Sequence, residues 1–411
     1  MLSLNFGFLK KDITISLRKL LAMAFLFSST FAWFYLFHTY LLDEIFESFA
    51  SLQWLYLGKA LFYTSIVVSA IIGSLISEKV NRRKLLWSWI AFGVLTTAWP
   101  AIFQGTTFSL VFSLLLGASF GLGFPSCLAF LADSTVTEER ARISGVLFFL
   151  TLTIGILFGL SSTLLNLGVL ELIVLALILR SSSFLALILD PCTRKTGKKK
   201  SWLAIMSSKD FVLYLFPWFI FNIANGLTGF LPENESASSM GPFLLFASAA
   251  IFALISGILA DRLGRKQPMI IGQLILGVSY NLLGLTTSQI SWYIYDVTQG
   301  IAWGFIAVAY FLAVLGDLSA SSGSKERFYV LGGIIPLVTV MGFSGISDLL
   351  GLKAPVSALS TALSILLYIS IIPVLRAKET LPETKKRERE IREYLDDKAR
   401  KYGKKSKNFK Q

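Results

Sequence analysis

The stretch GILADRLGRK, residues 257–266, places one acid, Asp261, beside the bases Arg262, Arg265 and Lys266. Apolar runs of membrane-spanning length flank this stretch on both sides. Charges are costly inside a bilayer, so the cluster predicts a tight turn at a membrane surface between two spanning segments. The fold class then depends on how many such runs the chain holds and on where its other charges lie.

The 411-residue chain is 54% hydrophobic and 15% charged, which is too apolar for a soluble domain, and its apolar residues fall in runs near bilayer length. Backbone groups inside a bilayer must be satisfied within their own segment, and the alternating pattern of a barrel strand is absent. The sequence therefore predicts an all-α membrane protein with about twelve transmembrane helices, at residues 20–42, 55–76, 85–103, 108–131, 143–165, 168–189, 211–231, 241–259, 268–285, 292–315, 328–349 and 354–374.

Nearly all of the 38 Lys and Arg residues lie before the first span, in alternate loops or in the tail, which by the positive-inside rule predicts that both termini are cytoplasmic. We expect the net charge of +13 to meet anionic membrane lipids rather than nucleic acid, because it is spread over short membrane-edge turns. Cys127 and Cys192 lie too far apart in sequence and depth to predict a disulfide or a metal site. One histidine and no phosphate-binding loop leave no expected metal or cofactor.

The charged stretch has a counterpart in the first half of the chain, SEKVNRR at residues 77–83. A second pair of similar segments, residues 132–145 and 316–332, recurs at nearly the same offset. In these alignments Glu78 corresponds to Asp261, Asp133 to Asp317, and Arg140 to Arg327. The repeat predicts two six-helix halves of the same orientation, residues 1–189 and 211–376, joined by a cytoplasmic linker, 190–210, and followed by a basic tail, 377–411.

The second-half stretch resembles the loop signature of the major facilitator superfamily, which its residues Gly257, Asp261, Arg262, Gly264, Arg265 and Lys266 match. The resemblance extends over nearly the whole chain and implies two parallel six-helix repeats that move a solute by alternating access. The first-half copy departs from the signature at Ser74, Glu78 and Asn81, and span 143–165 lacks the proline of the antiporter motif.

In that superfamily, spans 1, 4, 7 and 10 surround a central cavity. Carried onto this chain, these spans offer Trp33, Tyr35, Ser126, Asn222, Asn225, Asp296, Gln299, Trp303 and Tyr310. An aromatic and amide lining with one acid suits an uncharged polar, an amphipathic or a monocationic solute. Asp296 is therefore a candidate substrate or coupling residue, and His38, near the outer end of the first span, is a candidate proton site or a structural residue.

Arg180 falls near the middle of the sixth apolar run, where an unpaired guanidinium is costly. Two interpretations remain open from sequence. Arg180 is buried and has a partner, for which Asp296 and Glu171 are the candidate acids, or the helix ends early at the following serines and the side chain reaches the membrane surface.

The repeat symmetry predicts a charged contact between the halves on the cytoplasmic side. Asp261 should meet the start of span 143–165 near Arg140 and Arg142, and Glu78 should meet the start of span 328–349 near Lys325 and Arg327. Such contacts would act as a conformational gate, whose candidate members are Gly257, Asp261, Arg262, Gly264, Arg265, Lys266, Glu78, Arg82, Asp133, Arg140, Arg142, Asp317 and Arg327. The alternative is a set of turns whose charges only fix topology.

The sequence thus predicts a transporter and not an enzyme, since no reactive constellation is visible. The expected partners are a small solute, membrane lipids and, as a candidate coupling ion, the proton, with a monomer in the cell membrane as the working unit. The alternatives are a transporter-like receptor or scaffold that binds without translocating and, less favoured, an integral membrane enzyme.

Overall fold

The computed structural model describes residues 14–47, 52–103, 105–193, 197–232, 240–338, 341, 352–384, 391, 394 and 395. Three segments named by the sequence arguments fall outside these residues. They are most of the loop between the seventh and eighth spans, most of the second half of the span expected at 328–349, and most of the tail.

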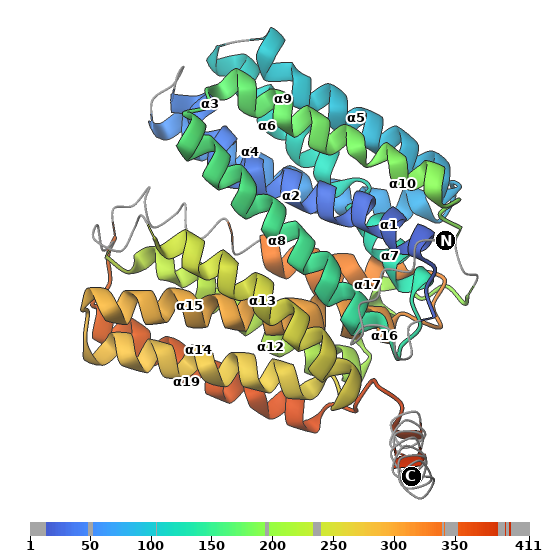
Figure 1. Ribbon diagram of the computed structural model, residues 1–411, viewed down its shortest axis with the longest axis vertical. Coiled ribbons are helices and arrows are strands. Elements are labelled where there is room, and N and C mark those ends of the chain that lie inside the picture. Colours follow the sequence, from blue (N-terminus) through green and yellow to red (C-terminus); the bar gives the residue numbers. More distant parts are fainter. Residues whose placement is uncertain are drawn as a thin grey trace, which may run out of the picture.

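The first group of helices, which we call the N-terminal group, lies in the upper part of Figure 1. It begins with one continuous helix that includes two π-helical segments, formed by α1 (Leu17–Met23), η1 (Ala24–Ser28), α2 (Ser29–Leu36), η2 (Phe37–Leu41) and α3 (Leu42–Glu47). The others are α4 (Leu52–Ser77), α5 (Arg82–Ile102), α6 (Thr106–Gly121), α7 (Phe124–Ser134), α8 (Arg140–Leu165), α9 (Val169–Ser182) and α10 (Phe184–Leu189).

The second group, the C-terminal group, lies in the lower part of Figure 1. A short helix, α11 (Trp202–Met206), leads into it. Its elements are α12 (Lys209–Leu227), η3 (Thr228–Phe230), α13 (Gly241–Arg262), α14 (Lys266–Leu285), α15 (Gln289–Ile306), η4 (Ala307–Val314), α16 (Leu315–Leu318), α17 (Lys325–Tyr329), η5 (Val330–Ile334) and α19 (Val356–Arg376).

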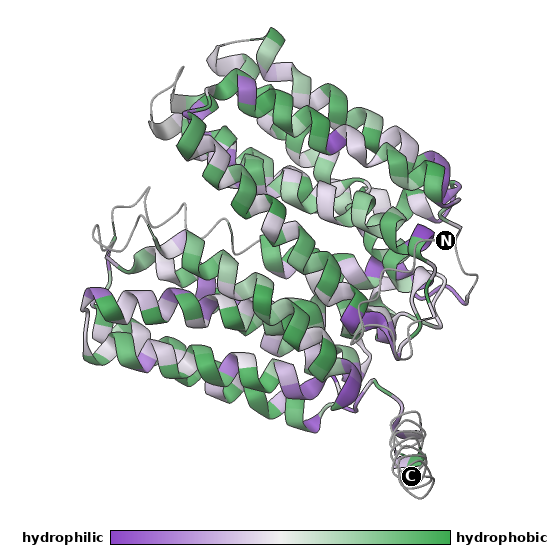
Figure 2. Cartoon of the chain, viewed as in Figure 1, coloured by the Kyte–Doolittle hydropathy of each residue, from purple (hydrophilic) through white to green (hydrophobic). Residues whose placement is uncertain are grey.

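Eleven helices among the described residues are long and apolar enough to cross a membrane. They correspond to eleven of the twelve expected spans, and the remaining one, expected at 328–349, starts as α17 and η5 and continues beyond the described residues. Figure 2 shows the hydrophobic residues that run along these helices. The all-α membrane fold expected from composition is therefore confirmed, although the first span is longer than expected, at Leu17–Phe46.

The two copies of the charged stretch turn in different ways, which explains their sequence difference. Gly264 has a φ of +114°, in the left-handed region that favours glycine. Its counterpart Asn81 has an extended backbone, and its side chain accepts a hydrogen bond of 2.9 Å from the backbone N–H of Arg83, so it caps the start of α5. In the first copy the asparagine therefore caps the start of the next helix, whereas in the second copy a glycine forms the turn.

The two groups meet most closely where α8 crosses α13, and glycines make this crossing possible. A Cβ at Gly145 would lie 2.5 Å from the carbonyl oxygen of Ala253, and one at Gly257 would lie 2.6 Å from that of Ala141. Neither position has room for a side chain. The first glycine of the signature stretch is therefore required by backbone contact between the groups.

Candidate functional site

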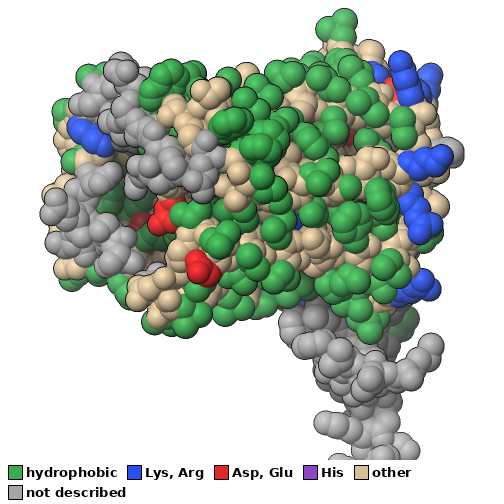
Figure 3. All heavy atoms as spheres, turned by 90° about the horizontal axis from the view of Figure 1, so that it is seen from above, with side chains coloured by type: hydrophobic (Ala, Val, Ile, Leu, Met, Phe, Trp, Pro, Cys, Tyr) green, Lys and Arg blue, Asp and Glu red, His purple; other side chains and the backbone are tan. Residues whose placement is uncertain are grey.

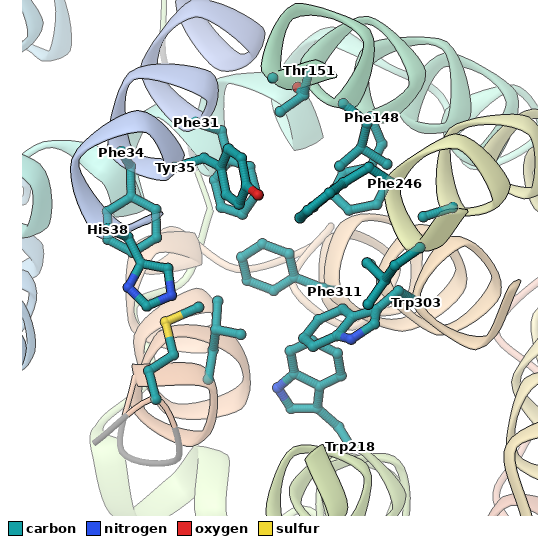
Figure 4. A pocket seen from close by; sticks show the side chains of 17 residues that line it. Phe31, Phe34, Tyr35, His38, Phe148, Thr151, Trp218, Phe246, Trp303 and Phe311 are labelled. Atoms are coloured by element: carbon teal, nitrogen blue, oxygen red, sulfur yellow. The ribbon is translucent and has the colours of Figure 1, made fainter. Parts of the chain in front are cut away.

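A cavity of about 230 Å³ lies between the two groups and is walled mostly by aromatic rings. Figure 4 shows these rings facing one another across the space. The lining residues come from α2, η2, α8, α12, α13, α15, η4 and the last described part of the eleventh span. They are Phe31, Phe34, Tyr35, His38, Phe148, Thr151, Leu152, Gly155, Trp218, Leu245, Phe246, Ala249, Trp303, Ala307, Phe311, Leu337 and Met341.

Ring contacts connect the walls of this cavity. The ring centroids of Tyr35 and Phe246 lie 4.6 Å apart across the two groups. Within the C-terminal group, Trp218 stacks on Phe311 at 5.8 Å and meets Trp303 edge-on at 6.1 Å. The described lining contains no Lys, Arg, Asp or Glu, so its chemistry is that of π-faces with a few polar edges.

Three of the residues expected at the cavity, Tyr35, His38 and Trp303, line it, whereas most of the others point elsewhere. The amides of Asn222 and Asn225 donate to carbonyl oxygens of their own helix, at 2.7 Å each, and Gln299 donates to the Asn225 oxygen at 2.8 Å. The remaining three are buried within their groups: Trp33, whose indole N–H donates to Thr97; Tyr310, whose hydroxyl donates to the Gly332 carbonyl; and Ser126.

Asp296 lies outside this described lining, at the opposite end of the bundle from the charged turns. It is half-buried beside the start of α13, where a Cβ at Gly241 would be 2.7 Å from its Oδ2. Asp296 and Trp303 are seven residues apart, so they share one face of α15 with two helical turns between them. The acid therefore stands about 10 Å along the helix from the aromatic wall.

Arg180 is fully buried within the N-terminal group, which decides between the two interpretations of its position. The helix does not end early, because α9 continues to Ser182 and α10 follows after one residue. The prediction that a carboxylate pairs with Arg180 is wrong. The guanidinium donates to Thr30 Oγ1 at 2.7 Å and to the Trp89 carbonyl at 3.3 Å. It also lies over the rings of Trp89, at 4.2 Å, and Trp33, at 5.0 Å.

Sequence reasoning named Tyr35, His38 and Trp303 but missed the other cavity residues, several of which belong to a periodic pattern. Phe31, Phe34, Tyr35 and His38 occupy positions i, i+3, i+4 and i+7, which is one face of a helix. The same spacing in α8 gives Phe148, Thr151, Leu152 and Gly155. A search for aromatic stripes on one face would have found the wall formed by α2 and η2, but not the α8 wall, where Phe148 is the one aromatic residue of the four.

Charged side chains from both groups meet at the end of the bundle that holds the signature stretch. We call this set the charged layer; it comprises Glu78, Arg82, Asp133, Arg140, Arg142, Asp261, Arg265, Asp317, Lys325, Glu326 and Arg327. Most of the Lys and Arg side chains visible in Figure 3 gather at one end of an otherwise largely apolar surface.

The contact expected for Asp261 is present. Its carboxylate is fully buried and accepts from the backbone N–H groups of Ala141 at 3.2 Å and Arg142 at 2.9 Å, and from Arg142 Nε at 3.1 Å. These donors form the amino terminus of α8, whose helix dipole favours a negative charge. Asp261 also pairs with Arg265 Nη1 of its own group at 2.5 Å.

The symmetric contact is present as well, with a change of register. Glu78 pairs with Arg327 at 2.8 Å and with Lys199 at 3.5 Å, but Lys325 pairs with Asp133, at 3.3 Å. Because Arg140 pairs with Asp317, the structure equates Arg140 with Lys325, and Arg142 with Arg327. The alignment of Arg140 with Arg327 was therefore wrong by two residues.

Within the charged layer, Arg82 and Arg265 each bind more than one carboxylate. Arg82 binds Asp133 at 2.7 Å and Glu326 at 3.3 Å, and Arg265 binds Asp317 at 3.0 Å. Burial alone would lower the pKa of the Arg265 guanidinium, but the carboxylates of Asp317 and Asp261 outweigh it and raise that pKa above its usual value. Two expected members make no ion pair in the described chain: Arg262 is exposed, and Lys266 donates to the Leu375 carbonyl.

The residues after the last helix also join this layer, which the sequence argument did not foresee. Glu379 accepts from the backbone N–H groups of Arg265 at 3.0 Å and Lys266 at 3.4 Å, so it caps the start of α14. The neighbouring Thr380 donates to Asp317 Oδ2 at 3.0 Å. The start of the tail is therefore part of the charged layer.

Known proteins share this architecture. Residues 19–324 match the sequence profile of the Major Facilitator Superfamily. Over 150 residues the chain is 28% identical to the class H tetracycline resistance protein of Pasteurella multocida, a match that spans 36% of this chain and only 37% of that relative.

Two solved structures have the same fold. The human organic anion transporter MFSD10 (TETRAN) has a TM-score of 0.65 at 14% identity, covering 87% of this chain and 99% of that one. The proton:xylose symporter XylE, bound to 6-bromo-6-deoxy-D-glucose, has a TM-score of 0.65 at 12% identity, covering 88% and 96%. Since the profile match covers most of the sequence, and the eleven described spans agree with it, this chain belongs to the Major Facilitator Superfamily, a family of membrane transporters.

Proposed function

We propose that this protein transports a small amphipathic monocation by alternating access. The observation that carries the proposal is the aromatic cavity between the two groups, closed at one end by the charged layer. A site midway between two bundles can be exposed to each side in turn when the bundles rock against one another. Residues 1–189 and 211–376 are the proposed rocking halves, with 190–210 as linker.

The lining supports a cation of apolar body. Aromatic faces attract ammonium groups, and Trp218, Trp303 and Phe311 surround one side of the space. The described lining contains no Lys or Arg that would repel a positive charge. We further propose that Asp296, two turns beyond Trp303, attracts the cation at the entrance from the opposite end.

The charged layer defines the conformational state. Asp261 and Glu78 each bind the start of a helix in the other group, so these bonds form only when the two groups are together at this end. We propose that both termini are cytoplasmic, as the positive-inside rule favours, so that this end faces the cytoplasm and its closure corresponds to the outward-facing state. We place the protein in the cell membrane as a monomer surrounded by lipid.

The test uses two aromatic ions of opposite charge. Purified protein in nanodiscs should be stabilised against heat by benzyltrimethylammonium and not by benzenesulfonate, because a ligand that binds the folded state raises its stability. Trp303→Leu should weaken the stabilisation, whereas Trp87→Leu, at an exposed indole outside the cavity, should not.

Transport distinguishes this function from that of a receptor. Proteoliposomes containing the protein should accumulate or equilibrate labelled benzyltrimethylammonium faster than empty liposomes. Binding without any movement would favour the receptor alternative. Equal stabilisation by both ions would contradict the cationic substrate class.

A further inference from the structure

His38 occupies an unusual position for the only histidine of the chain. It lies in the wall of the cavity, where its ring stacks on Phe34 with centroids 5.9 Å apart. Its Nδ1 is 2.7 Å from the hydroxyl oxygen of Tyr63 on α4. Figure 4 shows the imidazole at the edge of the cavity beside Phe34.

We propose that His38 is the proton-binding site that couples transport, and that Tyr63 positions its ring. The proposal rests on the function proposed above, because it assigns the coupling ion of that same cavity. A proton on His38 and a cationic solute would then compete for one cavity, which is the arrangement that proton–cation exchange requires.

Tyr63 suits this role because a hydroxyl both donates and accepts hydrogen bonds. When Nδ1 of the neutral imidazole lacks a proton, the Tyr63 hydroxyl donates to it. When Nδ1 carries a proton, as it does in the imidazolium ion, it donates to the Tyr63 oxygen. The partner is thus satisfied in each protonation state, so the ring can gain or lose a proton without leaving Nδ1 unpaired.

Two groups of opposite charge lie near the imidazole. Asp43 of α3 and Lys59 of α4 both act on the ring, and they pair with each other at 2.8 Å. Among the described cavity residues, Tyr35 is the other side chain with an ionisable group. The positive charge gained by His38 therefore meets no carboxylate within the described lining, and it opposes any cation held by the aromatic rings.

A single histidine makes the proton site directly observable. Protein labelled with ¹⁵N-histidine in nanodiscs gives one imidazole, whose NMR shifts should titrate between pH 4 and pH 9. Tyr63→Phe should lower the midpoint by about one pH unit, since hydrogen bonds to charged groups are the stronger ones. Tyr40→Phe, a matched loss of hydroxyl on the same helix as His38 but outside the cavity lining, should leave it unchanged. An imidazole that stays neutral over this range, or a midpoint insensitive to Tyr63→Phe, overturns the assignment.

Competition is tested by the affinity for benzyltrimethylammonium as a function of pH. We expect the wild-type affinity to fall about tenfold as pH decreases through the His38 midpoint, because two positive charges share the cavity. His38→Gln should remove this step and still bind the probe. Asp296→Asn should weaken binding at every pH and keep the step.

These outcomes separate the two proposals. If His38→Gln keeps the step and Asp296→Asn removes it, the proton is carried by Asp296 and the assignment to His38 is wrong, while cation transport stands. If the wild-type protein does not bind the probe at any pH, the proposed substrate class fails. The NMR titration would still decide whether His38 binds protons.

Discussion

Replacement of Asp261 by Asn should open the end of the bundle that carries the charged layer. The substitution keeps the shape of the side chain and removes its charge. It affects three hydrogen bonds that join the two groups, from Ala141 N–H, Arg142 N–H and Arg142 Nε, at 2.9 to 3.2 Å. The pair with Arg265 lies within one group, so it is present in both states and does not count toward the bias.

The size of the bias follows from these three bonds. A hydrogen bond to a charged group contributes about 1 kcal/mol more than a neutral one, so the three together shift the equilibrium by about 3 kcal/mol. This corresponds to about a 150-fold rise in the ratio of open to closed protein at this end. Asp261 is fully buried, so little water screens its interactions and the three hydrogen bonds keep their full strength.

The symmetric pair provides an internal comparison. Glu78 and Arg327 keep 10% and 14% of their side-chain surface exposed, whereas the Asp261 side chain is 0% exposed. Glu78→Gln should therefore shift the equilibrium by about 1 kcal/mol or less, in the same direction. An effect of Glu78→Gln equal to or larger than that of Asp261→Asn would contradict the role given to burial.

A cysteine at Ala313 reports the opening. This residue is fully buried against Ala141 and Ala260 between the groups, so a thiol there reacts only when the end separates. Cys127 and Cys192 are first replaced by serine, and the rate of reaction with an impermeant methanethiosulfonate is measured in detergent. The rate should rise strongly in Asp261→Asn. Glu139→Gln is the matched control, since Glu139 is a buried acid that accepts hydrogen bonds from Thr14 of its own group. An unchanged rate in Asp261→Asn, or the same rise in Glu139→Gln, would refute the gate.

Two further predictions concern stability, measured as the free energy of unfolding in detergent. Arg180→Lys should cost about 2 kcal/mol, because an ammonium cannot reproduce the stacking between two indoles, whereas Arg180→Met should cost less by filling the space without a buried charge; a larger loss for methionine would contradict this reading of Arg180. Truncation after Lys385 should leave stability unchanged, but truncation after Ala377 should cost about 2 kcal/mol by removing the Glu379 cap of α14; equal stability of the two truncated proteins would show that the cap contributes nothing.

The positions of the spans were predictable from sequence because they follow from local chemistry. An apolar run near bilayer length must become a helix, whichever neighbours it later meets. The charged turn and its counterpart were recognisable for the same reason, and their symmetry was enough to place Asp261 at the start of α8 and Glu78 near Arg327. The register of the second repeat was not predictable from sequence. The second copy has one extra residue between Asp317 and Lys325, and only the ion pairs show where it lies.

The cavity lining depended on which face each helix turns inward, and that is decided by packing between helices. Sequence reasoning selected amide and charged side chains beside aromatic ones, yet Asn222 and Asn225 satisfy their amides on their own helix and Arg180 finds its partners inside one group. Inside a membrane, a polar group is bonded wherever a partner is nearest, so its presence in a cavity helix does not place it in the cavity. The carbon faces of aromatic rings need no hydrogen-bond partner, so local bonding does not fix where they point. The rotation of α2, α12 and α15 about their axes is what places Phe34, Trp218 and Trp303 around one cavity. The sequence by itself determined the helices, their turns and the charges at their ends; the tertiary structure decided which side chains face the cavity, because helix rotation is set by contacts between segments far apart in the chain.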